Sequence, residues 1–152
     1  MAPKAVAVFT TRSVQGDVIF SDRKNGLYIE AVFTKLPKGK HGFHIHKAGD
    51  LRGEGCKLAC DHYHKGPPCS HGGPPGSPGP KGERHTGDLG NVEGLGKYTY
   101  LLRDVCVGDI IGRSIIVHAD EDDYGLGGQD DSLQTGHSGA RIACAIIGRS
   151  AC

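Results

Sequence analysis

The chain has 152 residues, of which 25 are Gly, nine are His and six are Cys, and its formal net charge is +1. This length fits one compact domain over residues 1–152. The near-zero charge, without clusters of Lys and Arg, argues against a nucleic-acid or membrane-surface binder. No apolar run approaches the roughly 18 residues of a membrane-spanning helix. Nine histidines are the first indication of metal.

Short runs of alternating apolar and polar residues predict β-strands along most of the chain. They cover residues 5–9, 14–20, 27–34, 41–46, 97–103, 114–118 and 141–147. Asn25-Gly26 is a hairpin signal between the second and third runs. No window of a dozen residues has helical periodicity without an interrupting Gly or Pro. We therefore expect an all-β sandwich or barrel.

Two long segments, 47–89 and 119–140, interrupt the strand pattern, and long loops in a compact domain are usually functional or disordered. The first contains four consecutive Gly-X-Y triplets, from Gly73 to Arg84. Four collagen-like triplets are too few for a stable triple helix. We expect an extended, polyproline-like excursion on the surface.

Three histidines in strand-like runs form the first candidate metal group. His44 and His46 are two residues apart, so a strand places both side chains on one face. His118 ends another apolar run. A single His-X-His pair in a strand is often incidental, but two neighbouring strands would bring three imidazoles together.

The first long loop contains a second candidate group. This loop is dense in potential metal ligands, which are His62, His64, His71, His85 and Asp88. Imidazole nitrogens with one carboxylate suit a tetrahedral zinc ion, and imidazole also suits copper. The alternative is a surface loop whose histidines are simply solvated.

Five motifs resemble, in order, the signatures of the copper/zinc superoxide dismutase family. They are GFHIH at 42–46, HGGP at 71–74, ERHTGDLGN at 83–91, GRSIIVH at 112–118 and GARIAC at 139–144. The resemblance implies an eight-stranded Greek-key β-barrel, an immunoglobulin-like sandwich with two long functional loops. It also implies a homodimer with one copper and one zinc ion per subunit. The collagen-like segment is an unusual insertion between His71 and His85, and this suggests a virus-encoded member.

The resemblance also implies a ligand set. Copper would be held by His44, His46, His62 and His118, and zinc by His62, His71, His85 and Asp88. Counting back from His71 by the family's usual spacing places the bridging position at Tyr63, which cannot bridge the metals. We therefore infer a one-residue insertion in this segment. We prefer His62 to His64 as the bridge because His62-Tyr63 matches the His-Phe or His-Tyr pair of the family.

Further residues match family positions. Arg141 would hold the anionic substrate, and Asp122 would hydrogen-bond to one copper ligand and one zinc ligand, unless it belongs to a solvated acidic run. Cys56 and Cys144 match the family disulfide, the alternative being two free thiols. The other family matches are Asp130, Asp131 and Thr135 of the electrostatic loop. The cysteines without an assigned partner are Cys60, Cys69, Cys106 and Cys152, and a Cys60–Cys69 bridge stays open.

The implied activity converts two superoxide anions and two protons to dioxygen and hydrogen peroxide by Cu(II)/Cu(I) cycling, with His62 as proton donor. Gln134 replaces a frequent Lys, which predicts a weaker dependence of rate on ionic strength. Ile142 replaces the Pro of chaperone-dependent relatives, which predicts copper loading without a chaperone. Ala48 and Arg149 stand where relatives often place larger apolar groups at the dimer contact, so the sequence supports the homodimer less strongly than the other family properties.

The amino-terminal run is too short for a secretory signal. We therefore expect a cytoplasmic protein, in the host cytoplasm if virus-encoded, or one whose signal has been removed. Alternative functions are the dismutase-like domain of a copper chaperone and a metal store without turnover. Chaperone domains often lack copper ligands or the arginine, and this chain has all of them.

Overall fold

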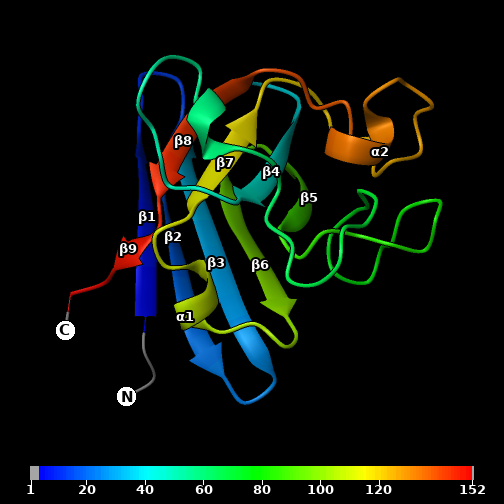
Figure 1. Ribbon diagram of the computed structural model, residues 1–152. Coiled ribbons are helices and arrows are strands. Elements are labelled where there is room, and N and C mark those ends of the chain that lie inside the picture. The colour runs from blue at the N-terminus through cyan, green and yellow to red at the C-terminus, as the bar shows by residue number, and fades with distance from the viewer. Residues whose placement is uncertain (1–3, 152) are drawn as a thin grey trace.

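Two antiparallel sheets form the body of the protein in a computed structural model, which describes residues 4–151 (Figure 1). The first sheet has the order β6-β3-β2-β1-β9, and the second has the order β5-β4-β7-β8. The strands of the first sheet are β1 Lys4–Thr10, β2 Gln15–Arg23, β3 Gly26–Lys35, β6 Gly96–Leu102 and β9 Gly148–Arg149. Those of the second are β4 Lys40–His46, β5 Asp88–Glu93, β7 Ser114–His118 and β8 Arg141–Ile146.

The predicted hairpin joins β2 to β3. Arg23 pairs with Gly26, so Lys24 and Asn25 form the two-residue turn. Gly26 has φ +139°, and a Cβ there would lie 2.2 Å from the Leu102 carbonyl oxygen of β6. Only glycine therefore allows this hairpin and β6 to approach so closely.

Aromatic side chains from both sheets meet in the core. Phe33 of the first sheet and Phe43 of the second have ring centroids 5.6 Å apart at 74°. Phe9 and Tyr100 flank Phe43 at 6.5 and 6.3 Å. Since Phe43 directly precedes His44 on β4, this packing fixes the position of the strand that carries the histidine pair.

The all-β class and the two-sheet sandwich are confirmed, but the predicted eight-stranded barrel differs from the structure in two respects. The described residues form nine strands, because the short strand β9 pairs with β1. No hydrogen-bonded ladder joins the two sheets within residues 4–151, and β5 and β6 are edge strands. At the β5–β6 turn the Tyr98 hydroxyl bonds backbone groups of Glu93 and Gly94. A side chain thus satisfies backbone polar groups at this turn.

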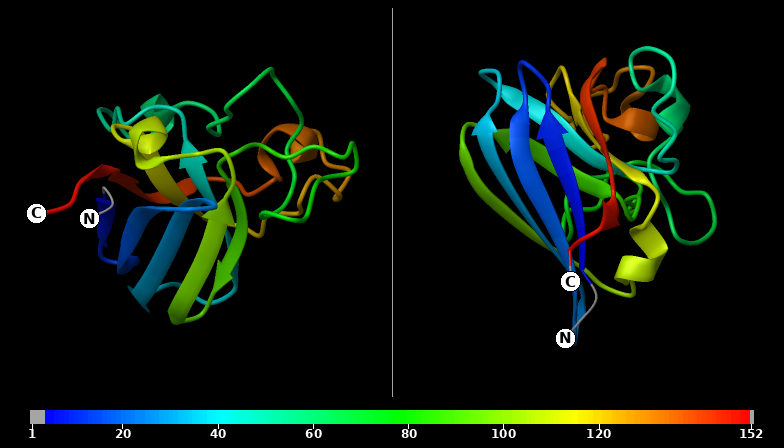
Figure 2. Two further views of the ribbon diagram at one scale, coloured as in Figure 1. Left: turned by 90° about the horizontal axis from the view of Figure 1, so that it is seen from below. Right: turned by 90° about the vertical axis from the view of Figure 1, so that its left-hand side faces the viewer.

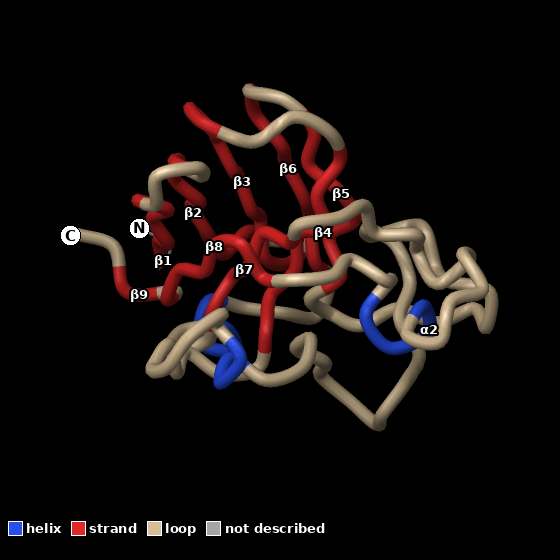
Figure 3. Tube along the Cα trace, turned by 90° about the horizontal axis from the view of Figure 1, so that it is seen from above, coloured by secondary structure: helices blue, strands red, loops and turns tan. Residues whose placement is uncertain are grey.

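Both long loops lie on the same side of the strands, as the two views of Figure 2 show. The helical segments η1 (Lys57–Ala59), α1 (Val107–Ile110) and α2 (Ser132–Thr135) lie outside the sheets (Figure 3). No helix of the described chain is long and apolar enough to cross a membrane. The first loop ends at Gly87 rather than near Leu89, because β5, which sequence periodicity missed, begins at Asp88.

The collagen-like segment is not an extended excursion. It contains two tight turns, in which the Ser77 amide donates to Pro74 O at 2.8 Å and the Gly82 amide to Gly79 O at 2.9 Å. Pro residues restrict φ and favour the first positions of such turns, and glycines supply the remaining conformations. The triplet pattern therefore encodes consecutive turns.

A disulfide joins Cys56, at the start of η1, to Cys144 of β8, across a sequence separation of 88 residues. This confirms the predicted pair. Cys60, Cys69 and Cys106 are free thiols, so the Cys60–Cys69 bridge is wrong. Cys152 lies outside the described residues.

Truncating the central aromatic tests the core. Phe43→Ala removes a fully buried ring, and we expect the free energy of unfolding to fall by about 3–5 kcal/mol. The matched control is Val8→Ala on the outer face, where the side chain is 49% exposed and the change should stay within about 0.5 kcal/mol. Chemical denaturation measures both, and equal losses would contradict this description of the core.

Candidate metal centre

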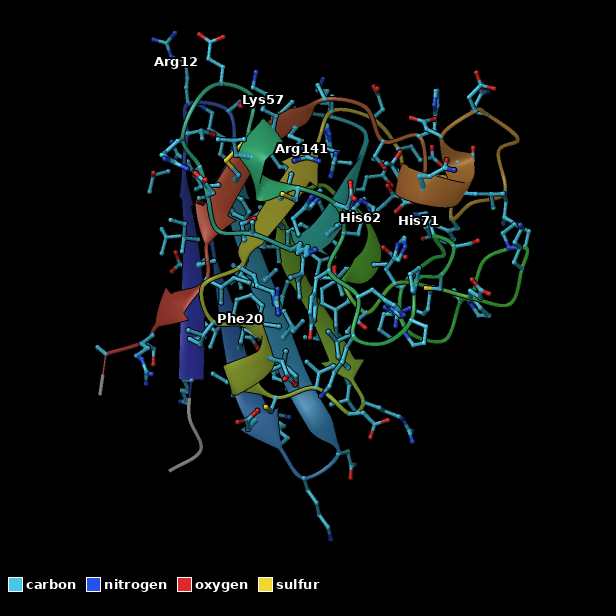
Figure 4. The ribbon with its side chains drawn as sticks, in the orientation of Figure 1. Arg12, Phe20, Lys57, His62, His71 and Arg141 are labelled. Carbon is cyan, nitrogen blue, oxygen red and sulfur yellow. A yellow bond between two sulfur atoms is a disulfide. The ribbon has the colours of Figure 1, made fainter. Side chains whose placement is uncertain are left out.

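Strands β4 and β7 supply three imidazoles that converge on one place beside the second sheet. His44 and His46 occupy alternate positions of β4, and His118 ends β7 next to an irregularity in the β7–β8 register. His62 reaches the same place from the first loop through an isolated bridge to His46. In Figure 4, His62 and His71 lie near each other between the strands and the α2 loop.

One ligand atom from each of these four histidines, the copper-type group, lies within 4.8 Å of the others. His44 Nδ1 and His62 Nε2 are buried without a hydrogen-bond partner, and His46 Nε2 faces His118 Nε2 at 3.2 Å. The opposite ring nitrogens donate to carbonyl groups, His46 Nδ1 to Cys60 O and His118 Nδ1 to Gly139 O. These bonds leave the remaining nitrogens free to converge on one ion.

A second group combines three imidazoles with one carboxylate. The members of this zinc-type group are His62, His71, His85 and Asp88. Asp88 Oδ1 lies 2.9 Å from His62 Nδ1 and 3.1 Å from His71 Nδ1, and Asp88 Oδ2 lies 3.3 Å from His85 Nδ1. Ligands bound to zinc in a tetrahedron would lie about 3.3 Å apart. The donor set and spacing therefore fit zinc.

His62 is the residue shared by both groups. Its Nε2 is unpartnered among the copper-type imidazoles, and its Nδ1 lies against Asp88. His64 belongs to neither group, since its Nδ1 accepts a hydrogen bond from the Thr86 amide at 3.1 Å. The geometry favours His62 over His64 as the bridge.

Asp122 links the two groups from behind. His44 Nε2 donates to its Oδ2 at 2.6 Å, and His71 Nε2 donates to its Oδ1 at 2.8 Å. Asn91 holds Asp122 by reciprocal bonds, with Asn91 Nδ2 donating to Asp122 O and the Asp122 amide donating to Asn91 Oδ1. Asp122 is thus a buried positioning residue and not part of a solvated acidic run.

Two supporting residues were missed by sequence reasoning. Gly136 has φ +73°, and a Cβ there would lie 2.2 Å from Asp122 Oδ1 and 2.5 Å from His71 Nε2. Only glycine leaves room for that hydrogen bond. Asn91 ends the ERHTGDLGN motif, which is the only signal that could have identified its role.

Burial sets the protonation of the copper-type imidazoles. Desolvation lowers the pKa of His44 and His46 well below the usual value and lowers that of His118 to about 3. All three are therefore neutral near pH 7, as metal ligation requires.

The zinc-type group has the opposite electrostatics. Burial would raise the pKa of Asp88, but hydrogen bonds from His62, His71 and His85 outweigh it and hold that pKa far below its ordinary value. Burial also opposes protonation of His71, yet hydrogen bonds to Asp122 and Asp88 raise its pKa to about 9. The carboxylate is therefore an anion and can serve as a hard oxygen ligand for a cation.

Arg141 lines a cavity of about 860 Å³ together with His46, His62 and His118, whereas His44 lies outside its lining. The half-buried guanidinium donates to Cys56 O at 2.8 Å and to Cys60 O at 2.7 Å. The disulfide at Cys56 thus helps to fix a cation beside the site. Asp131 and Thr135 also line the cavity, whereas the exposed Asp130 does not.

Removing the charge that links the groups tests this arrangement. In Asp122→Asn an amide nitrogen would face one of the two imidazole donors, so we expect zinc affinity to fall about 10- to 100-fold. Competition with a chromophoric chelator measures the affinity. Asp130→Asn, an exposed position in the same loop, is the control and should bind zinc as the unchanged protein does. Equal affinities in the two variants would contradict the role of Asp122.

Comparisons with known proteins agree with this geometry. Residues 14–147 match the copper/zinc superoxide dismutase (SODC) family. The chain is 45% identical over 145 residues to the Cu-Zn superoxide dismutase of Paramecium bursaria Chlorella virus 1, covering 89% of this chain and 73% of that protein. The extracellular Cu-Zn superoxide dismutase of Drosophila melanogaster is 41% identical, with 89% and 76% covered.

Two other relatives have different names. The copper chaperone for superoxide dismutase of Rattus norvegicus is 43% identical over 97% of this chain, which spans only 53% of that protein. The crystal structure of the clock protein EA4 superposes with a TM-score of 0.82 and 34% identity, covering 97% of this chain and 94% of that one. On the family match and the identity to the viral enzyme, the chain belongs to the copper/zinc superoxide dismutase family.

Proposed function

We propose that the protein is a superoxide dismutase. It would convert two superoxide anions and two protons to dioxygen and hydrogen peroxide by Cu(II)/Cu(I) cycling. The observation that carries the proposal is the shared His62 imidazole, whose unpartnered Nε2 joins a four-nitrogen group at the cavity that Arg141 lines.

The residues present fit one copper and one zinc ion per subunit. Four neutral imidazoles, His44, His46, His62 and His118, suit copper, while three imidazoles and the Asp88 carboxylate suit zinc. Buried ring nitrogens without a partner are costly unless a ligand occupies them. Bound copper would supply a one-electron redox couple, which zinc lacks.

The protein groups then have distinct tasks. Arg141 stays charged at neutral pH and attracts the small anion to the cavity. His62 would hold a proton at Nε2 whenever that nitrogen is not bound to copper and would deliver it to the reduced product, and water would supply the second proton of hydrogen peroxide. The bond between His62 Nδ1 and Asp88 keeps the imidazole aimed at the cavity. Asp122 orients His44 and His71 but contacts no substrate.

A second candidate function is copper delivery, which the 43% identity to the rat chaperone favours. Delivery requires transfer of copper to another protein, and it does not require Arg141 beside the metal. Three of the four copper-type histidines line one cavity with the arginine, and this favours turnover instead.

The remaining family properties are part of the same proposal. We infer one domain with Greek-key strand order, a homodimer, and residence in the cytoplasm, that of the host if virus-encoded. Ile142 packs against the core and leaves β8 without a proline. Copper loading without a chaperone is proposed on that basis.

Rapid-mixing kinetics on reconstituted protein test the function. We expect fast superoxide removal by the copper–zinc form and none above the uncatalysed rate by the zinc-only form, because only copper changes oxidation state. Absence of turnover with both metals bound would contradict the proposal. Copper transfer to an apo-dismutase by that inactive protein would then establish the delivery function.

Paired histidine variants test the bridge. We expect His62→Ala to abolish dismutation and to weaken zinc binding at least about tenfold, because one imidazole is lost from both groups. His64→Ala should retain both properties, since His64 Nδ1 accepts a hydrogen bond from Thr86 and the residue supplies no ligand atom to either group. Metal analysis and kinetics on the two proteins compare them, and the reverse pattern would assign the bridge to His64.

A further inference from the structure

The collagen-like segment contributes a cation to the substrate cavity. Lys81 lines the cavity of about 860 Å³ together with His46, His62, His118 and Arg141. It comes from the insertion between His71 and His85, and its side chain is exposed. The segment that is unusual for the family therefore forms part of the approach to the site.

The turn that carries Lys81 is closely packed against the metal-ligand segment. The Gly82 amide donates to Gly79 O, and the Gly79 amide donates to Glu83 O at 2.7 Å. A Cβ on Gly79 would lie 2.4 Å from the His71 carbonyl oxygen, so the turn touches the backbone of a ligand residue. This contact holds the base of the Lys81 side chain at the cavity wall while its ammonium group stays solvated.

Most other charged side chains that line the cavity are held by hydrogen bonds or ion pairs, which Lys81 lacks among residues 4–151. Arg113 donates to Asp109 O and Lys47 O and lies over the Tyr63 ring. Arg141 is tied to two carbonyl groups, and the acidic Asp131 is paired with His137 at 2.6 Å.

Lys81 has no ion pair within residues 4–151. Glu83, the acidic residue nearest in sequence, accepts a hydrogen bond from the Ser70 amide. The positive charge of Lys81 is therefore available to an approaching anion.

We propose that Lys81 is a substrate-guiding residue that draws superoxide toward Arg141. The proposal rests on the proposed dismutase function. Gln134, on the opposite loop of the same cavity, is neutral. Lys81 supplies a positive charge from the insertion instead and offsets the weaker salt dependence that Gln134 alone predicts. Charges at the mouth of a cavity raise association rates of small ions and lose this effect as salt increases.

The main test is the second-order rate constant for superoxide as a function of ionic strength. Lys81→Gln should lower it about twofold at roughly 0.01 M ionic strength, and the difference should vanish near 1 M, where the Debye length is about 3 Å. Lys81→Arg should keep the charge and the rate. Lys24→Gln is the matched control, because it removes one positive charge at the β2–β3 turn, which lies away from the loops (Figure 1).

A second readout is independent of turnover. In zinc-loaded protein, titration with azide, a small monovalent anion, can be followed by NMR of the Arg141 guanidinium. Lys81→Gln should weaken the shift-derived affinity about twofold at low salt, and Lys24→Gln should not. Equal behaviour of the Lys81 and Lys24 variants in both experiments would overturn the proposal. A Lys81-dependent azide affinity without any turnover would instead refute the dismutase function and leave Lys81 as an anion-recruiting residue.

Discussion

The shared imidazole of His62 is the constraint on which the site depends. One ring must place its Nε2 among three histidines from β4 and β7 and its Nδ1 against the loop carboxylate Asp88. The first loop must therefore be held to strand β4, and the isolated bridge between His62 and His46 does this. A loop free to move would lose both metal groups together.

Buried polar partners keep that arrangement from relaxing. Asp122 holds His44 and His71 from behind, and Asn91 and Gly136 fix Asp122 and leave room for it. The same low-dielectric surroundings keep His118 neutral, because desolvation penalises its charged form. The disulfide at Cys56 then positions Arg141 from the other side of the cavity. Stability and substrate approach therefore depend on the same loop.

Much of this could be predicted from short-range patterns. Period-two alternation identified seven of the strands, and motif order identified the family and the Cys56–Cys144 pair. Alternation missed β5, because Gly90 and Asn91 separate its two apolar residues, Leu89 and Val92. Sequence reasoning did not identify Gly136, because its role depends on residues distant in sequence. The turns of the collagen-like segment were also missed, because they depend on packing against His71. The hydrogen bonds of the Tyr98 hydroxyl at the β5–β6 turn are likewise a side-chain feature that no strand pattern encodes.

The most direct test of the central claim is proton release when copper is added to the zinc-loaded protein at pH 7, measured by calorimetry in buffers of different ionisation enthalpy. His44, His46 and His118 are neutral at that pH, so each can bind a metal without losing a proton. Only an imidazole that uses both nitrogens must lose its remaining N–H. We expect the release of about one proton per copper ion and no such release in His62→Ala. Binding without proton release would contradict a bridging His62.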